Sequence, residues 1–194
     1  ILLVAARAVA NADDPKAAAE RLRSASWSGV ERARREGGAR KATDAVLEGI
    51  LESESFQLGS FTLKSGKSSP LYIDLRRIPS FPKLFAQVLD RYEDLAGHCS
   101  FDALAAIPTA GLPIGSALAA RMGVPLIYPR IPPKPHGTGR PVEGHYEEGM
   151  RVLLLDDLVS QATSKIEAAG ILRECGLVVD ELVVLIERGN ARAE

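Results

Sequence analysis

Apolar residues follow two patterns along the chain, one with the three- and four-residue spacing of helices and one of short continuous or alternating runs. Helices are predicted at 45–52, 81–95, 111–121 and 164–175. Strands are predicted at 56–63, 71–75, 103–107, 126–128, 152–155 and 182–186. Strands alternating with helices predict a mainly parallel sheet with helices on both faces. Because such sheets bind ligands after their strands, we expect the chemistry just after Ile107, Tyr128, Leu155 and Ile186.

Polar residues suggest where some of these elements begin. Ser80 is the expected N-cap of the helix at 81–95, with Pro82 in its first turn. Nearer the start of the chain, Ile1 to Val4 is typical of the end of a buried strand. Asp14 and Pro15 are typical of a helix start.

The stretch 30–41 is basic and contains glycines, which indicates a linker or a solvated helix. No aromatic residues interleave with its charges, so a solvated charged face is favoured over a nucleic-acid patch. We therefore divide the chain into an N-terminal extension, 1–42, and a main domain, 43–194.

Composition narrows the classes of partner. Over 194 residues the net charge is −1, which argues against general binding to nucleic acid or to an anionic membrane surface. No apolar run is long enough to span a bilayer. The two cysteines, Cys99 and Cys175, form no disulfide framework or metal-binding spacing, so a cytoplasmic location is expected. Small molecules are the predicted ligands.

The segment 151–164 carries the most chemical information. An apolar strand ends in Asp156 and Asp157, and a small hydroxyl-bearing loop leads into the helix that begins at Ser164. Backbone N–H groups at a helix N-terminus bind anions, and adjacent carboxylates accept hydrogen bonds from ribose hydroxyls or act on a bound Mg²⁺. A phosphorylated sugar fits both features. The alternative is that the two aspartates are ordinary turn and cap residues.

This segment resembles the phosphoribosyl pyrophosphate (PRPP) motif of type I phosphoribosyltransferases, and the domain resembles orotate phosphoribosyltransferase. The other matching segments, in the family's order, are 61–66 with 69–74, 107–113, 128–139 and 185–189. The resemblance implies the type I phosphoribosyltransferase fold, an α/β fold whose central, mainly parallel sheet is flanked by helices, with a small N-terminal hood. It also implies transfer of the 5-phosphoribosyl group from PRPP to orotate, giving orotidine 5′-monophosphate and pyrophosphate in pyrimidine biosynthesis.

Residue roles follow from the same resemblance. It implies PRPP contacts from Lys64, Thr109, Ala110, Arg130, Lys134, His136, Asp156, Asp157, Ser160, Gln161, Ala162, Thr163 and Ser164. It implies orotate contacts from Tyr72, Ile73, Ser160 and Arg188. The implied catalytic residues are Lys134, His136, Asp156 and Asp157.

The resemblance also implies a cofactor and an assembly. Mg²⁺ is the implied cofactor, held mainly by PRPP and touched by Asp156 or Asp157. The mobile loop from Arg130 to Pro141 acts in the neighbouring subunit in this family, so a homodimer is implied.

The sequence departs from the family pattern at a few positions. Ala162 replaces a usual glycine, Gln161 is bulkier than the common residue, Ile131 replaces a common lysine, and Ala110 stands where many bacterial members have lysine. These departures motivate an alternative function, a PRPP-binding regulatory or catalytically degenerate homologue. Transfer to another base is a further alternative, which the segment around Lys64 disfavours.

Residues 3–15 are similar to the closing strand and helix of an orotidine-5′-phosphate decarboxylase. The resemblance implies that Arg7 descends from a phosphate-binding arginine. The chain begins without Met, and we expect it to be the C-terminal part of a fused decarboxylase and transferase. We expect no decarboxylase activity, because so short a segment cannot form a barrel. The alternative is an unrelated N-terminal helix.

Overall fold

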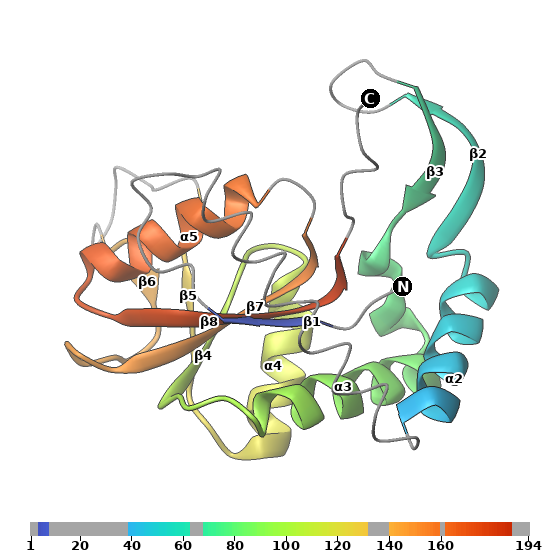
Figure 1. Ribbon diagram of the computed structural model, residues 1–194. Helices are drawn as coiled ribbons and strands as arrows, with labels where there is room; N and C mark the ends of the chain where they lie inside the picture. The colour runs from blue at the N-terminus through green and yellow to red at the C-terminus, as the bar shows by residue number, and fades with distance from the viewer. Residues whose placement is uncertain (1–3, 8–38, 63–67, 132–139, 160–161, 188–194) are drawn as a thin grey trace.

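The computed structural model describes residues 4–7, 39–62, 68–131, 140–159 and 162–187, and its main body is a six-stranded sheet (Figure 1). In spatial order its strands are β1 (Val4–Arg7), β8 (Val178–Glu187), β7 (Arg151–Val159), β4 (Ala103–Ala106), β5 (Leu126–Pro129) and β6 (Val142–Glu143). The inner pairs β8–β7, β7–β4 and β4–β5 are parallel, and the two edge pairs are antiparallel. The predicted mainly parallel sheet is therefore confirmed.

Helices cover both faces of this sheet, as the continuous apolar strands predict. On one face lies α5 (Thr163–Glu174), and on the other lie α3 (Pro82–Ala96) and α4 (Gly111–Met122) (Figure 1). Successive residues of a strand point to opposite faces. In β7, Leu154 packs with the α5 cluster, whereas Leu153 and Leu155 pack with the α3 and α4 cluster. Each apolar run thus contributes to two cores.

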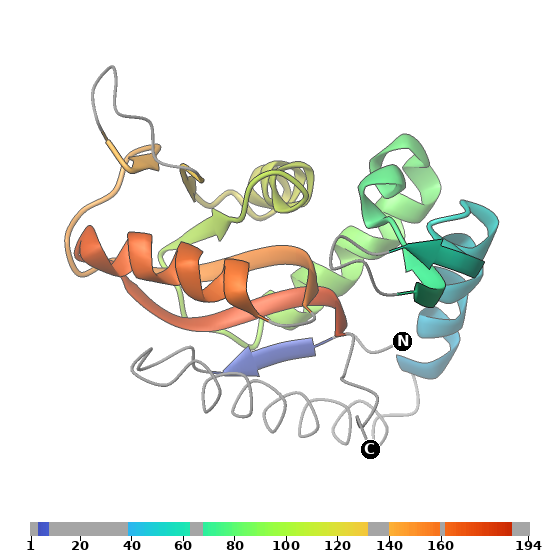
Figure 2. The ribbon, with the colours of Figure 1, turned by 90° about the horizontal axis from the view of Figure 1, so that it is seen from above.

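Strand β1 pairs antiparallel with β8 at the outer edge of the sheet, in the register Val4↔Val184 to Arg7↔Glu181 (Figure 2). The sequence predicts a strand at Ile1 to Val4, so the strand is confirmed but lies further along the chain. Its partner is almost 180 residues away, and no local pattern indicates that pairing. Beyond β1, the predicted helix after Asp14 lies outside the described residues.

Two other boundaries differ from prediction for identifiable reasons. Strand β7 continues to Val159 because it keeps pairing with β8 as far as Glu187, so Asp156 and Asp157 lie within the strand and not after it. The predicted cap at Ser80 is wrong. Ser80 ends a 3₁₀ helix, η1 (Leu75–Ser80), and Phe81 takes the N-cap position of α3 without a side-chain hydrogen bond.

A two-stranded antiparallel hairpin, β2 (Phe56–Thr62) and β3 (Ser68–Ile73), projects away from the main sheet (Figure 1). It follows α2 (Ala39–Glu52), whose first turn lies in the basic stretch that the sequence left open as linker or helix. The rings of Phe61 and Tyr72 pack across the two strands with their centroids 5.5 Å apart. This hairpin matches the small N-terminal hood implied by the family resemblance.

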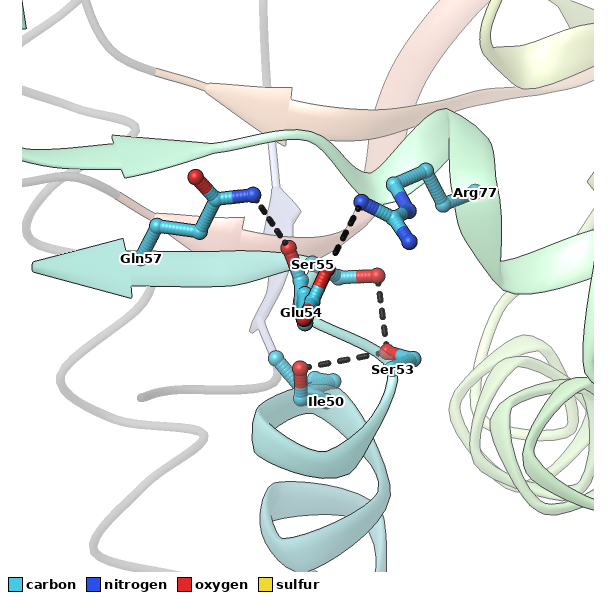
Figure 3. A network of polar contacts seen from close by, with 6 residues as sticks. All are labelled: Ile50, Ser53, Glu54, Ser55, Gln57 and Arg77. Atoms are coloured by element: carbon cyan, nitrogen blue, oxygen red, sulfur yellow. Dashed lines mark hydrogen bonds and ion pairs between the residues drawn. The ribbon is translucent and has the colours of Figure 1, made fainter.

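Hydrogen bonds at the end of α2 fix the base of the hairpin (Figure 3). The Ser53 hydroxyl donates to the Ile50 carbonyl at 3.1 Å and lies 2.8 Å from the Ser55 hydroxyl, and both serines are buried. Arg77 in η1 reaches the Glu54 carboxylate at 3.5 Å. The hairpin is therefore attached to both α2 and η1. In the part of the chain that the structure describes, no helix has the length and apolar character needed to cross a membrane.

Candidate active site

The carboxyl ends of β4, β5 and β7 lie at one edge of the sheet because the three strands are parallel. Thr109 and Ala110 follow β4 and lead into α4, Arg130 follows β5, and Asp156 and Asp157 lie in the last part of β7. The Ile107 N–H donates to the Leu155 carbonyl at 2.9 Å, which ties the ends of β4 and β7 together. The structure thus brings these predicted residues to one edge of the sheet.

Gly111 allows α4 to begin directly against β7. A Cβ at this position would lie 2.7 Å from the Leu155 carbonyl oxygen and 3.5 Å from Oδ1 of Asp156. A backbone oxygen cannot move aside easily, so only glycine permits this approach. The loop after β4, which contains a cis peptide between Pro108 and Thr109, therefore lies beside the carboxylate pair.

Asp156 is nearly inaccessible and its polar atoms are all engaged. Its Oδ2 lies 2.6 Å from Nζ of Lys165, and its Oδ1 accepts a hydrogen bond from the Asp157 N–H at 2.9 Å. The buried Tyr92 hydroxyl donates to the Asp156 carbonyl at 2.6 Å. Asp156 and Lys165 are each less than a tenth exposed. Asp156, predicted as a substrate ligand, is thus part of a buried ion pair.

Sequence reasoning missed Lys165. One signal was available: a lysine in the first turn of a helix faces the positive end of the helix dipole, which is unfavourable without a nearby anion. The anion is Asp156, nine residues earlier on β7. A buried lysine requires such a partner, because removing its charge from water is costly.

Of the two adjacent aspartates, Asp157 is the more accessible and is half-buried. Its pKa is raised to about 7, first by burial and then by the adjacent charge of Asp156, while the charge of Lys165 acts in the opposite direction. A carboxyl group with a pKa near neutrality changes its protonation state readily when a ligand arrives. Hydroxyl donors from a sugar favour its ionised form.

The N-terminus of α5 has the geometry of an anion site. Ala162 is the N-cap, with φ 59° and ψ −3°, and its carbonyl accepts hydrogen bonds from the N–H groups of Lys165 and Ile166, both at 2.9 Å. No side chain in the described part of the chain caps this helix. The exposed Thr163 and Ser164 follow. Backbone N–H groups and the helix dipole therefore remain available to an anion.

The alanine at position 162 adopts the left-handed conformation that the family's glycine serves. The residue is only 5% exposed and belongs to the core cluster beneath α5. A left-handed alanine still costs about 1–2 kcal/mol relative to an unstrained backbone.

Arg130, a predicted PRPP ligand, contacts Glu143 on β6 through Nε and Nη2. Its main-chain N–H also donates to the Pro141 carbonyl at 2.8 Å. Together these contacts join the two ends of the segment that the sequence identifies as a mobile loop. Ile131, at the position of a common family lysine, packs partly buried against the core. The departure therefore replaces a charged side chain with an apolar one that packs on the core at the start of the segment.

The remaining predicted residues divide into two groups. Tyr72 is 38% exposed on the hairpin, and Ile73 packs partly buried against the core, both on a different sheet from the carboxylates. The following lie outside the described residues: Lys64, Lys134, His136, Ser160, Gln161 and Arg188. Among the described side chains no cluster of three or more His, Cys, Asp or Glu offers a metal site. The carboxylate oxygens of Asp157 suit Mg²⁺ only together with oxygens from a ligand or water.

Comparison with known proteins decides the family. Residues 83–194 match the phosphoribosyl transferase domain family. The chain is 43% identical over 140 residues to the orotate phosphoribosyltransferase of Cenarchaeum symbiosum, an alignment covering 70% of each protein. This chain belongs to the orotate phosphoribosyltransferase family. Membership makes it a transferase domain of pyrimidine biosynthesis, as the resemblance implies.

Solved structures agree with this membership. UMP synthase from Leishmania donovani superposes with a TM-score of 0.68 at 41% identity, covering 92% of this chain and 37% of that one. Orotate phosphoribosyltransferase from Aeropyrum pernix gives a TM-score of 0.63 at 27% identity, covering 72% and 92%. These likenesses confirm the type I phosphoribosyltransferase fold.

Some relatives in this family are much longer than this chain. The bifunctional enzyme PyrF/PyrE of Nostoc is 40% identical over 144 residues, which is 74% of this chain and 30% of that protein. The chain thus spans about a third of the length of the Nostoc and Leishmania proteins.

Proposed function

We propose that this transferase domain joins orotate to the ribose of PRPP, giving orotidine 5′-monophosphate and pyrophosphate. One observation carries the proposal: the uncapped N-terminus of α5 adjoins a carboxylate pair at the carboxyl edge of a parallel sheet. An anion site beside carboxylates that accept sugar hydroxyls is what a phosphorylated ribose requires, and this arrangement supports the proposal. Relatives named orotate phosphoribosyltransferase at 34–43% identity support orotate as the acceptor.

In the proposed reaction, N1 of orotate forms a bond to C1 of the ribose while the bond from C1 to the pyrophosphate oxygen breaks, and pyrophosphate leaves with the electron pair. The N1–H bond of orotate breaks as well, and its proton passes to water or to an oxygen of the pyrophosphate. The sugar becomes cationic and the leaving group anionic in the transition state. Positioning and electrostatic stabilisation therefore supply most of the catalysis. No described side chain needs to form a covalent bond to the substrate.

The described residues have separate proposed tasks. The N–H groups at the start of α5, with Thr163 and Ser164, bind the 5′-phosphate of PRPP. The ionised Asp157 accepts hydrogen bonds from the ribose hydroxyls and faces the developing positive charge of the sugar. Thr109 and Ala110, at the start of α4, are placed to contact the pyrophosphate through their backbone. Arg130 reaches PRPP only after leaving Glu143.

Other proposed roles rest on the family resemblance. Lys64, Lys134 and His136 stabilise the phosphates and the leaving pyrophosphate, while Gln161 and Ser160 line the phosphate loop. Ser160, Tyr72, Ile73 and Arg188 bind orotate, since an arginine fork suits a carboxylate or paired carbonyl oxygens. Mg²⁺ is the proposed cofactor and supplies charge neutralisation on the pyrophosphate.

The proposed assembly is a homodimer in which the segment 130–141 acts in the partner's site. The proposed location is the cytoplasm, supported by two cysteines that form no disulfide. The resemblance of residues 3–15 to a decarboxylase, with the lengths of the fused relatives, supports a chain that continues a decarboxylase domain.

The second candidate function is PRPP binding without transfer, as in a regulatory or degenerate homologue. The observation that favours it is the pairing of Arg130 with Glu143, which removes one expected phosphate ligand from the site. The left-handed backbone at Ala162 is the conformation that the family's glycine allows, and it supports a phosphate subsite for either function. Calorimetric titration with PRPP and Mg²⁺, beside an assay for pyrophosphate release with orotate, separates the two. Binding together with pyrophosphate release supports the transferase, whereas binding without release supports the alternative.

A further inference from the structure

Lys165 joins two elements that the proposed reaction must keep in register. It lies in the first turn of α5, directly after the residues proposed to bind phosphate, and its ammonium group is 2.6 Å from Oδ2 of Asp156 on β7. Its second contact is the Ser164 hydroxyl at 3.2 Å. Lys165 and Asp156 are the two charged residues among the buried polar side chains of the described part. Their pair spans the loop between β7 and α5.

Water cannot replace either member of the buried ion pair between Lys165 and Asp156 without a large cost in free energy. Asp156 also accepts the Asp157 N–H, so the ion pair and the position of the second carboxylate belong to one connected set of contacts. Removing one member of a buried ion pair leaves an uncompensated charge and disturbs its neighbours strongly. The orientation of Asp157 therefore depends on Lys165 through Asp156.

We propose that Lys165 is a positioning residue of this transferase, whose ion pair with Asp156 holds the phosphate-binding turn of α5 in register with the carboxylate pair that receives the ribose. The inference rests on the proposed function of these two subsites. Lys165 itself does not bind the phosphate, because its ammonium group is buried and already contacts Asp156 and Ser164.

A ligand that needs both subsites distinguishes this role from direct phosphate binding. PRPP carries a phosphate and a ribose, so its affinity depends on their register. Inorganic phosphate needs only the start of α5. Lys165→Met keeps the length of the side chain and removes the charge. It is expected to weaken PRPP binding at least tenfold and inorganic phosphate binding less than threefold, measured by calorimetry on the full chain with Mg²⁺.

Three further variants complete the experiment. Lys83→Met makes the same change at an exposed lysine of α3 and is expected to leave both affinities unchanged. Lys165→Arg keeps the charge and is expected to recover most of the PRPP affinity, which also provides a folded variant if Lys165→Met unfolds. In an Asp156→Asn background, Lys165→Met is expected to weaken PRPP binding less than threefold, because the pair is already absent.

The results separate this inference from the proposed function. Parallel loss of PRPP and inorganic phosphate binding in Lys165→Met and Lys165→Arg makes Lys165 a direct ligand and overturns the positioning role. So does PRPP affinity within twofold of the original in the folded Lys165→Met variant. If the unsubstituted chain binds PRPP without turnover, the transferase proposal fails while the affinities still decide the role of Lys165. If it binds no PRPP, both fail.

Discussion

At the scale of single residues, two buried groups shape the site, the methyl group of Ala162 and the charge of Lys165. Ala162 has a left-handed backbone and belongs to the buried core. Lys165 neutralises the charge of Asp156, the carboxylate that the sequence predicts as a PRPP ligand. A linear pattern does not show which way the Ala162 methyl group points. The position of Lys165 in the first turn of a helix indicates an anionic partner but does not identify Asp156. The residue types of the site could be predicted from sequence, but their partners could not.

Ala162→Gly tests whether the alanine costs activity. Glycine relieves about 1–2 kcal/mol of left-handed strain. Against this, the loss of a buried methyl group destabilises the folded state by roughly 0.8 kcal/mol, and the greater entropy of the unfolded chain destabilises it by roughly 0.5–1 kcal/mol. We expect the free energy of unfolding, measured by thermal unfolding, to change by less than about 1 kcal/mol, and the KM for PRPP to change by less than threefold. A tenfold decrease in that KM would show that the methyl group crowds the ligand.

Asp157 gives the protein a pH-dependent stability. Its pKa is raised from 3.8 to about 7 in the folded state, mainly by burial, so the folded state binds more protons than the unfolded state between these values. Stability therefore falls as the pH rises from about 4 to about 7, and changes little beyond. The asparagine of Asp157→Asn is neutral at every pH. We therefore expect the unfolding free energy of the variant, relative to that of the original chain, to rise between pH 4 and pH 7 by on the order of 1–2 kcal/mol.

Thermal or urea unfolding at several pH values, without PRPP and Mg²⁺, measures this difference. Asp90→Asn on the surface of α3, where Asp90 pairs with Arg121 at 2.6 Å, serves as the control for removing a carboxylate away from the site. An Asp157→Asn difference that stays constant from pH 4 to pH 8 contradicts the raised pKa.

At the scale of elements, close contacts between β7, α4 and α5 assemble the site. The start of α4 lies against the Leu155 carbonyl because position 111 has no side chain, and the start of α5 is tied to β7 by Lys165. The apolar runs predict these strands and helices well. They do not predict the continuation of β7 to Val159, since that depends on pairing with the end of β8.

Gly111→Ala tests the contact between α4 and β7. The added Cβ would lie 2.7 Å from the Leu155 carbonyl oxygen, so α4 must shift. We expect a loss of about 1–3 kcal/mol in unfolding free energy and a reduction of PRPP turnover of tenfold or more. Gly170→Ala in α5 is the matched control. It has open space around its Cβ position, and we expect it to be neutral or stabilising by up to about 1 kcal/mol. Equal behaviour of the two variants would contradict the close-contact account.

At the scale of the whole molecule, a parallel sheet covered on both faces carries a projecting hairpin and an added edge strand. The sheet and its helices could be predicted because consecutive apolar runs report burial on both faces. The pairing of β1 with β8 could not be predicted, because it joins distant segments of the chain. Strand β6 could not be predicted either, because it is only two residues long. Strand β1 covers a backbone edge that would otherwise be open to other chains.

Deleting residues 1–38 tests the role of β1. We expect a lower unfolding temperature and more self-association beyond any dimer, measured by light scattering, because the edge of β8 becomes exposed. Deleting residues 1–3 leaves β1 intact and serves as the control. A shortened chain that keeps both its unfolding temperature and its size distribution would show that β1 is dispensable.

If this domain forms the bond between orotate and phosphoribose, orotate is consumed in the reaction, and its absorbance measures that loss. The protein is mixed with orotate, PRPP and Mg²⁺, and absorbance and pyrophosphate are followed together. We expect a PRPP-dependent loss of orotate with one pyrophosphate released for each orotate consumed, and a rate at least a hundredfold lower in Asp157→Ala. Absence of turnover at high protein concentration, with the chain folded and PRPP bound, would contradict the proposed function.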